Sequence, residues 1–158
     1  MKAVTVKEIK TELQESSPQK LIELCLRLSR FKKENKELLT YLLFESDNEE
    51  AFIYSIKEAV DAQFELINTK TYYFIKKSVR KILRTIKKFV RYSQNTETEV
   101  ELLLYFCSKL KDFEPSYKNN KVLTNMYVRE IALIKKKLIT LHEDLQYDYN
   151  LELELLEN

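Results

Sequence analysis

The residues whose types and spacing could do chemistry are the Lys and Arg side chains between positions 70 and 91. No Asp or Glu occurs between Leu66 and Thr96. Wound as an α-helix at about 100° per residue, these cations fall within one arc of about 140°, and aliphatic residues fill the opposite arc. The cations are Lys70, Lys76, Lys77, Arg80, Lys81, Arg84, Lys87, Lys88 and Arg91. A row of ammonium and guanidinium groups neutralises phosphates along a nucleic-acid backbone, so the pattern predicts a surface that binds polyanions.

We call the part of this row on residues 76–91 the cationic face. We expect it to contact the backbone of nucleic acid without sequence specificity, and we expect Tyr73 to stack on an unpaired base. The expected contacts of the cationic face are Lys76, Lys77, Arg80, Lys81, Arg84, Lys87, Lys88 and Arg91. The sequence therefore predicts a non-catalytic binding module.

The same cations allow other interpretations. If residues 48–67 and 71–92 form an antiparallel helical hairpin, Glu58, Asp61 and Glu65 come close enough to pair with Lys76, Lys77 and Arg80. An acidic protein or an anionic membrane surface would also suit a basic amphipathic helix. The alternative function is a protein-interaction or assembly module. Its basic helix would pair with acidic segments of a partner or of the chain itself, and the chain could then form a homo-oligomer.

Catalytic and cofactor motifs are not evident. The chain contains 0 Gly, where average usage would give about 11, and phosphate-binding loops and nucleophile elbows need Gly. The single histidine, His142, has no second ligand at a metal-binding spacing. Cys25 and Cys107 each lie in an apolar helical pattern, which predicts buried, reduced thiols. We therefore expect no enzyme activity, no metal and no cofactor.

The apolar segments predict a cytoplasmic protein. The first ten residues have no apolar core of the length of a signal peptide. No apolar run approaches the 18 or more residues of a transmembrane helix. Reduced cysteines agree with a cytoplasmic location.

Hydrophobic periodicity and helix-start signals predict helices along almost the whole chain. Capping boxes are expected at 5–8 and 96–99, and Ser17 with Pro18 forms another helix start. The expected helices cover residues 5–15, 17–31, 36–45, 48–67, 71–92, 96–112 and 122–143, with a polar turn at 32–35. Asparagine tolerates the left-handed conformation, so we expect helices to stop at Asn35, Asn68, Asn95, Asn119 and Asn120.

These elements predict an all-α chain, 1–158, that forms a single domain built as an antiparallel bundle of six or seven helices. The alternative is a short α-solenoid of the HEAT type, because residues 21–31 and 103–113 align without gaps and share Leu, Cys, Leu and Phe positions. Residues 145–158 form an acidic tail. We expect a break at 146–150 and then either a short terminal helix or a docked, partly ordered tail.

Overall fold

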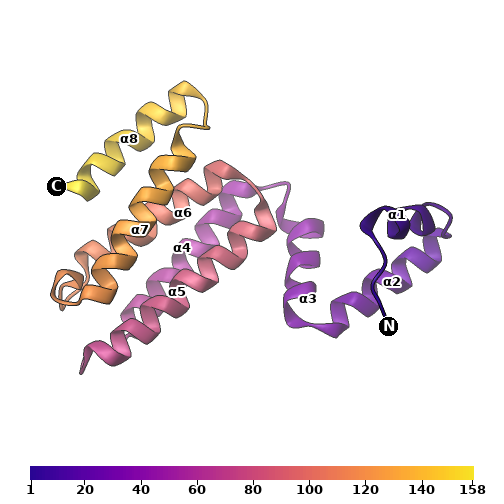
Figure 1. The fold of residues 1–158 in the computed structure, drawn as a ribbon, viewed down its shortest axis with the longest axis horizontal. Coiled ribbons are helices and arrows are strands. Elements are labelled where there is room, and N and C mark those ends of the chain that lie inside the picture. Colours follow the sequence, from indigo (N-terminus) through magenta and orange to yellow (C-terminus); the bar gives the residue numbers. More distant parts are fainter. The chain divides into compact units, whose positions relative to one another are not determined.

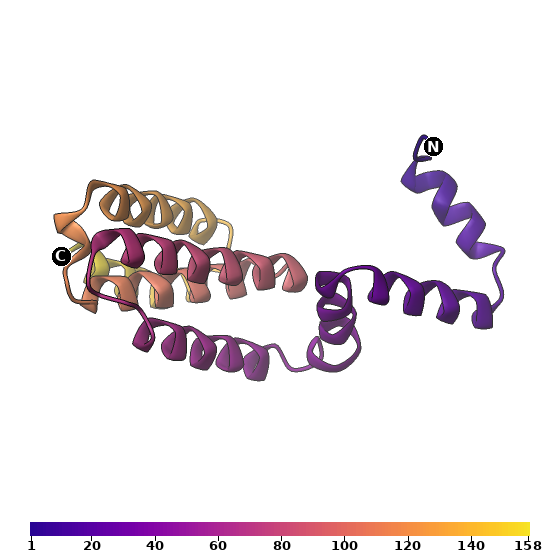
Figure 2. The same ribbon diagram turned by 90° about the horizontal axis from the view of Figure 1, so that it is seen from below.

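The computed structural model describes all residues, 1–158, and contains helices and no strands (Figures 1 and 2). The all-α prediction is confirmed, with eight α-helices in place of the expected six or seven. They are α1 (Val6–Gln14), α2 (Pro18–Phe31), α3 (Lys33–Thr40), α4 (Glu49–Glu65), α5 (Tyr72–Ser93), α6 (Thr96–Asp112), α7 (Lys121–Leu138) and α8 (Glu143–Glu157). A π-helix, Tyr41–Glu45, follows α3, and a 3₁₀ turn, Tyr117–Asn119, precedes α7. The choice between bundle and solenoid stays a prediction.

The chain divides into two compact units, Met1–Phe44 with α1–α3 and Glu45–Asn158 with α4–α8. The single domain stays a prediction. In the first unit, Thr5 and Glu8 form the expected capping box. Ser17 caps α2 and Pro18 occupies its first turn, also as expected. Helices α1, α2 and α3 contain no buried residue, so the expectation that Cys25 is buried is wrong.

The second unit is built around α6. Leu102, Leu103, Leu104, Phe106 and Cys107 are all buried, so this helix is covered over most of its circumference there, and only the side with Tyr105 is half-buried. Helix α6 contacts α4, α5, α7 and α8, and Figures 1 and 2 show its ribbon among those of the other helices of this unit. A helix with apolar residues all round is stable only when it is buried in this way. The neighbours of α6 therefore use their own apolar faces to cover it.

Helix α5 has the amphipathic character that its sequence predicts. Its buried aliphatic side chains are Ile75, Val79, Ile82, Leu83 and Ile86. The helix spans Tyr72–Ser93 where 71–92 was expected. It ends at Gln94, which has φ 55° and is the only residue with a positive φ. In a chain without glycine, glutamine thus takes the left-handed position that closes a helix.

Several asparagines begin helices where we expected them to end helices. Asn95 accepts a hydrogen bond from the Glu97 N–H, and Asn120 accepts one from the Val122 N–H. Asn35 lies inside α3. The side-chain oxygen of asparagine is a good acceptor at the N-cap position. This property explains why Asn95 and Asn120 lie at the start of a helix. The capping box expected at 96–99 is wrong for the same reason, because Asn95 is the N-cap of α6.

The C-terminal break lies earlier than expected. Helix α7 ends at Leu138, and α8 runs without interruption over Glu143–Glu157, so the break expected at 146–150 is wrong. His142 is the N-cap of α8, and its Nδ1 accepts a hydrogen bond from the Asp144 N–H at 3.3 Å. Helix α8 contacts α6 and α7. The acidic tail is therefore a docked helix.

Candidate polyanion-binding face

The cationic face lies on α5, as predicted. Most of its side chains are exposed to solvent, namely Lys77, Arg80, Lys81, Arg84 and Arg91, and the others, Lys76, Lys87 and Lys88, are half-buried. At 1.5 Å per residue, the fifteen steps from Lys76 to Arg91 span about 22 Å, which is the length of about six base pairs. The structure therefore brings the predicted cations together in one row of useful length.

Glu58, Asp61 and Glu65 of α4 do not form ion pairs with Lys76, Lys77 or Arg80. Asp61 accepts a hydrogen bond from the Tyr105 hydroxyl at 2.6 Å and lies 2.9 Å from Lys109 Nζ, both on α6. The hydrogen bond from Tyr105 lowers the pKa of Asp61. Glu58 lies one turn from Tyr54 on its own helix and raises the pKa of that hydroxyl. The expected pairing of all three acids with α5 is wrong, because none of them lies within ion-pair distance of these cations and α6 supplies the partners of Asp61.

One cation of the face has a buried partner. Lys87 Nζ lies 2.7 Å from Oε2 of Glu130 on α7, a side chain with 0% exposure. This contact is an ion pair without the angles of a hydrogen bond, so Oε2 accepts no hydrogen bond. Arg129 Nε lies 3.1 Å from the other oxygen, Oε1. The Glu130 carboxylate therefore holds the charged ends of Lys87 and Arg129 close to each other.

The other seven cations of the cationic face do not share the Glu130 partner of Lys87. Lys88 makes other contacts, including one with the Phe89 ring, whose centroid lies 4.9 Å from Nζ. No carboxylate lies within ion-pair distance of the other six, which are Lys76, Lys77, Arg80, Lys81, Arg84 and Arg91. Most of the positive charge of the face is therefore not neutralised by the chain itself.

Tyr73 lies at one end of the face, in the first turn of α5. Its side chain is exposed, and its ring packs edge-on against Phe74 with centroids 5.4 Å apart. An exposed ring held by an aromatic neighbour can receive a base on its free side. Its role as a stacking residue stays a prediction.

A groove that the sequence did not predict borders the face. It has a volume of about 780 Å³ and lies between α5 and α7, with Glu99 of α6 also lining it. Arg80, Arg84, Lys87 and Arg91 line one side, and Arg129 lines the other. We call it the arginine groove. The groove could not be predicted from the sequence, because the sequence does not say that α7 lies beside α5. The one sequence feature that marks it is the presence of Arg, and not Lys, at most of its cationic positions.

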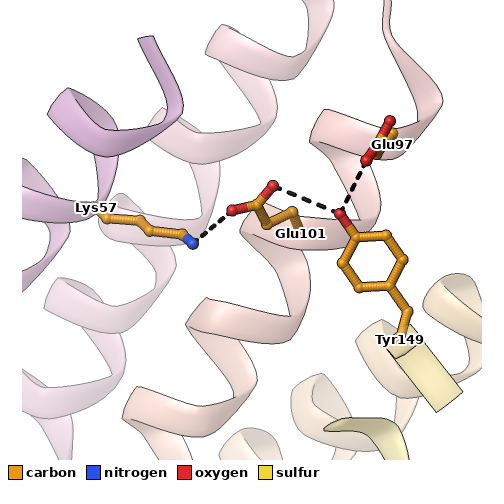
Figure 3. A network of polar contacts seen from close by, with 4 residues as sticks. All are labelled: Lys57, Glu97, Glu101 and Tyr149. Atoms are coloured by element: carbon orange, nitrogen blue, oxygen red, sulfur yellow. Dashed lines mark hydrogen bonds and ion pairs between the residues drawn. The ribbon is translucent and has the colours of Figure 1, made fainter. Parts of the chain in front are cut away.

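Figure 3 shows a polar network by which α8 is held on α6. Tyr149 of α8 is buried, and its hydroxyl donates a shared hydrogen bond to Glu97 and Glu101 of α6, at 3.3 and 3.5 Å. Glu101 also pairs with Lys57 of α4, whose Nζ lies 2.6 Å away. The acidic helix therefore docks on α6 and α7 and leaves the cations of α5 to other partners.

Buried tyrosines give the unit a pH dependence. Burial raises the pKa of Tyr127, burial and the nearby Glu101 and Glu97 raise the pKa of Tyr149, and burial with the bond to Asp61 raises the pKa of Tyr105 to about 12. The unfolded chain ionises its tyrosines near pH 10. Because the folded state holds these protons more tightly, its stability is fully present below about pH 10 and falls as the pH rises toward the folded pKa values.

The buried Cys107 thiol, whose pKa burial raises to about 12, adds a loss of stability that begins near pH 9, where the unfolded thiol ionises. We therefore expect the free energy of unfolding in urea to begin to fall near pH 9 and to fall more steeply above about pH 10. Tyrosinate absorbance should show these hydroxyls ionising later than the exposed ones. The variant Tyr149→Phe should lose less stability across the alkaline range than the unaltered chain. One common ionisation step near pH 10 for all tyrosines would contradict the expectation.

The two cysteines and the single histidine are the other side chains that the sequence offered as candidates. Both cysteines are free thiols, and burial raises the pKa of the Cys107 thiol to about 12. His142 is exposed, and the structure gathers no group of three or more His, Cys, Asp or Glu side chains. No helix has the length and apolar character needed to cross a membrane.

Sequence reasoning located the cationic face but missed Arg129 and Glu130, which α7 brings next to it. Comparisons with models of protein families, with curated proteins and with solved structures gave no match. Function is therefore inferred from the residues and geometry of the chain itself.

Proposed function

We propose that this chain is a non-catalytic binding module whose cationic face holds the backbone of nucleic acid without reading its sequence. The observation that carries the proposal is the row of six cations on α5 that have no carboxylate partner in the chain. The docking of acidic α8 on α6 and α7 supports it, because no carboxylate of α8 is then paired with a cation of α5. Free thiols suit the reducing cytoplasm, where we propose the module acts.

The spacing of the cations favours a polymer over a single small anion. Successive cations follow each other every one to four residues along about 22 Å of helix. Contacts of this kind go to phosphates and release counterions, so they carry affinity and no base specificity. With four to six such contacts, the affinity should fall about 10²- to 10³-fold between about 50 and 200 mM salt.

The test uses two exposed lysines of the face that do not line the arginine groove. Lys77→Gln with Lys81→Gln should reduce the slope of log affinity against log salt by about 2, because two phosphate contacts are lost. Fluorescence anisotropy with short oligonucleotides of different sequence measures this slope. Lys118→Gln with Lys136→Gln is the matched control, since both lysines are exposed, lie off α5 and form no ion pair.

We expect the control pair to bind as the unaltered chain does, and we expect affinity to change little with base sequence. Equal slopes for the two double variants would show that the face is not the binding surface. An affinity that did not respond to salt would contradict backbone binding altogether. Circular dichroism at the same temperature checks that both variants keep their helices.

A further inference from the structure

The arginine groove concentrates one kind of cation. All four arginines of Glu45–Asn158 line it, namely Arg80, Arg84, Arg91 and Arg129, whereas only one of the fourteen lysines in that unit, Lys87, does so. The one acidic residue in its lining, Glu99, already pairs with Lys137 at 2.7 Å. Guanidinium groups bind carboxylates in a planar, two-pronged way that an ammonium group cannot match. The arginine groove is therefore suited to binding carboxylates that a rigid partner presents at defined positions.

The rest of the lining is aliphatic. Leu83 and Val90 come from α5, and Val122, Met126 and Leu133 come from α7. No aromatic ring lines the groove, so it offers no platform on which a base could stack. A groove between two helices with an apolar lining and charged edges is the usual receptor for an amphipathic helix. This composition favours a protein segment that carries both carboxylates and aliphatic side chains.

Helix α8 has this composition on its outward side. Its inward residues, Tyr149, Leu153 and Leu156, are buried. Tyr147, Leu151 and Leu155 follow one another at four-residue spacing and are 68%, 49% and 70% exposed. The helix contains six Asp and Glu and no Lys or Arg. An acidic helix thus presents a second apolar stripe for which its own unit, Glu45–Asn158, provides no cover.

We propose that the arginine groove of one copy of this chain binds the outward face of α8 from a second copy. Tyr147, Leu151 and Leu155 would lie against the aliphatic lining, and the neighbouring Asp144 and Asp148 would pair with the arginines. From Tyr147 to Leu155 the helix rises about 12 Å, and the arginines of α5 from Arg80 to Arg91 cover about 16 Å. The two surfaces therefore match in charge, in apolar character and in length.

A chain cannot make this contact with itself. The Tyr127 hydroxyl donates a 2.8 Å hydrogen bond to the Leu156 carbonyl, and this buried bond fixes α8 on α7 with its apolar stripe turned outward. Because groove and helix are different surfaces, the contact between copies is head-to-tail, and repetition gives a ring or an open chain. One helix face is a small interface, so association should be weak, in about the micromolar range.

The first experiment is sedimentation velocity of the full chain at about 50 mM and about 500 mM salt. The unaltered chain should associate at the lower salt and dissociate at the higher. Asn125→Glu places a carboxylate in the groove at an exposed position, and Tyr147→Lys with Leu151→Lys places cations on the outward face of α8. Each variant alone should lower the association constant at least about tenfold.

Mixing the two variants gives the sharper result. The Asn125→Glu chain keeps an intact α8, and the Tyr147→Lys, Leu151→Lys chain keeps an intact groove, so the mixture should form a 1:1 pair and nothing larger. Circular dichroism confirms that both variants are folded. A monomeric unaltered chain at low salt, variants that associate as the unaltered chain does, or a mixture that stays monomeric would each overturn the proposal.

This inference does not depend on nucleic-acid binding, and the same proteins separate the two. The α8 variant should keep its full affinity for an oligonucleotide, and the Lys77→Gln, Lys81→Gln variant should still self-associate. An oligonucleotide should dissociate the assembly, because Arg84 and Arg91 belong to both surfaces. If Asn125→Glu abolished oligonucleotide binding and left self-association unchanged, the groove would be a nucleic-acid site and the proposal would fail.

Discussion

Replacing Lys87 by methionine is expected to lower the free energy of unfolding by about 3 kcal/mol, because it leaves the buried Glu130 carboxylate without its nearest cation. Glu130 is fully buried and its Oε2 accepts no hydrogen bond, so Lys87, 2.7 Å away, supplies the main compensation for that oxygen. We place the loss at the low end of the range of about 3–5 kcal/mol for broken buried pairs, because Arg129 still contacts the carboxylate.

Two further variants separate this cause from a general effect of removing a lysine. Lys81→Met changes an exposed, unpaired lysine on the same helix and should alter stability by less than about 0.5 kcal/mol. Combining Lys87→Met with Glu130→Leu removes both charges and should restore most of the loss. Urea denaturation followed by circular dichroism measures all three. A Lys87→Met chain as stable as the Lys81→Met chain would contradict the expectation.

The largest loss is expected from Phe106→Ala, at about 3–5 kcal/mol, because the substitution opens a cavity in the centre of α6. Phe106 has 0% exposure, and its ring centroid lies 6.1 Å from that of Phe64 on α4. Its neighbours Leu102, Leu103 and Cys107 are also buried, so few of them can move inward to fill the space. Denaturant unfolding at constant temperature measures the change.

Two controls define this prediction. Phe106→Leu keeps most of the volume and should lose clearly less than the alanine variant. Tyr73→Ala removes an exposed ring from the surface of α5 and should change stability by less than about 0.5 kcal/mol. Losses of similar size for Phe106→Ala and Tyr73→Ala would show that α6 is not the centre of the packed unit.

The sequence predicts best those features of the fold that depend on the residues of one helix alone. Helix α5 was predicted to within one residue at each end because a single apolar period decides it, from Ile75 to Ile86. Its exposed cations followed from the same period. The second half of α7 was less predictable. Residues 139–142 carry no Pro or Gly to mark the break, and His142 acts as an N-cap in a role that the sequence alone did not suggest.

Contacts between helices were the part of the site that could not be derived. The expected pairing of Asp61 with α5 considered two helices, whereas Tyr105 and Lys109 on α6 compete for the same carboxylate and bind it. The arginine groove needs α5 and α7 side by side, although they are separated in sequence by the whole of α6. Patterns along one helix fix which side is buried, and they do not say which neighbour buries it.

The separation of the cations of α5 from the acids of α8 has a consequence for how the unit meets other molecules. Glu45–Asn158 holds 18 Lys and Arg and 19 Asp and Glu, so its overall charge is close to zero. A body of this kind has a large electric dipole, and a highly charged polymer exerts a torque on it before any contact forms. Encounters are then biased in orientation, with the basic end leading and the acidic end trailing. Added electrolyte shortens the reach of that torque, so orientation during approach weakens together with attraction.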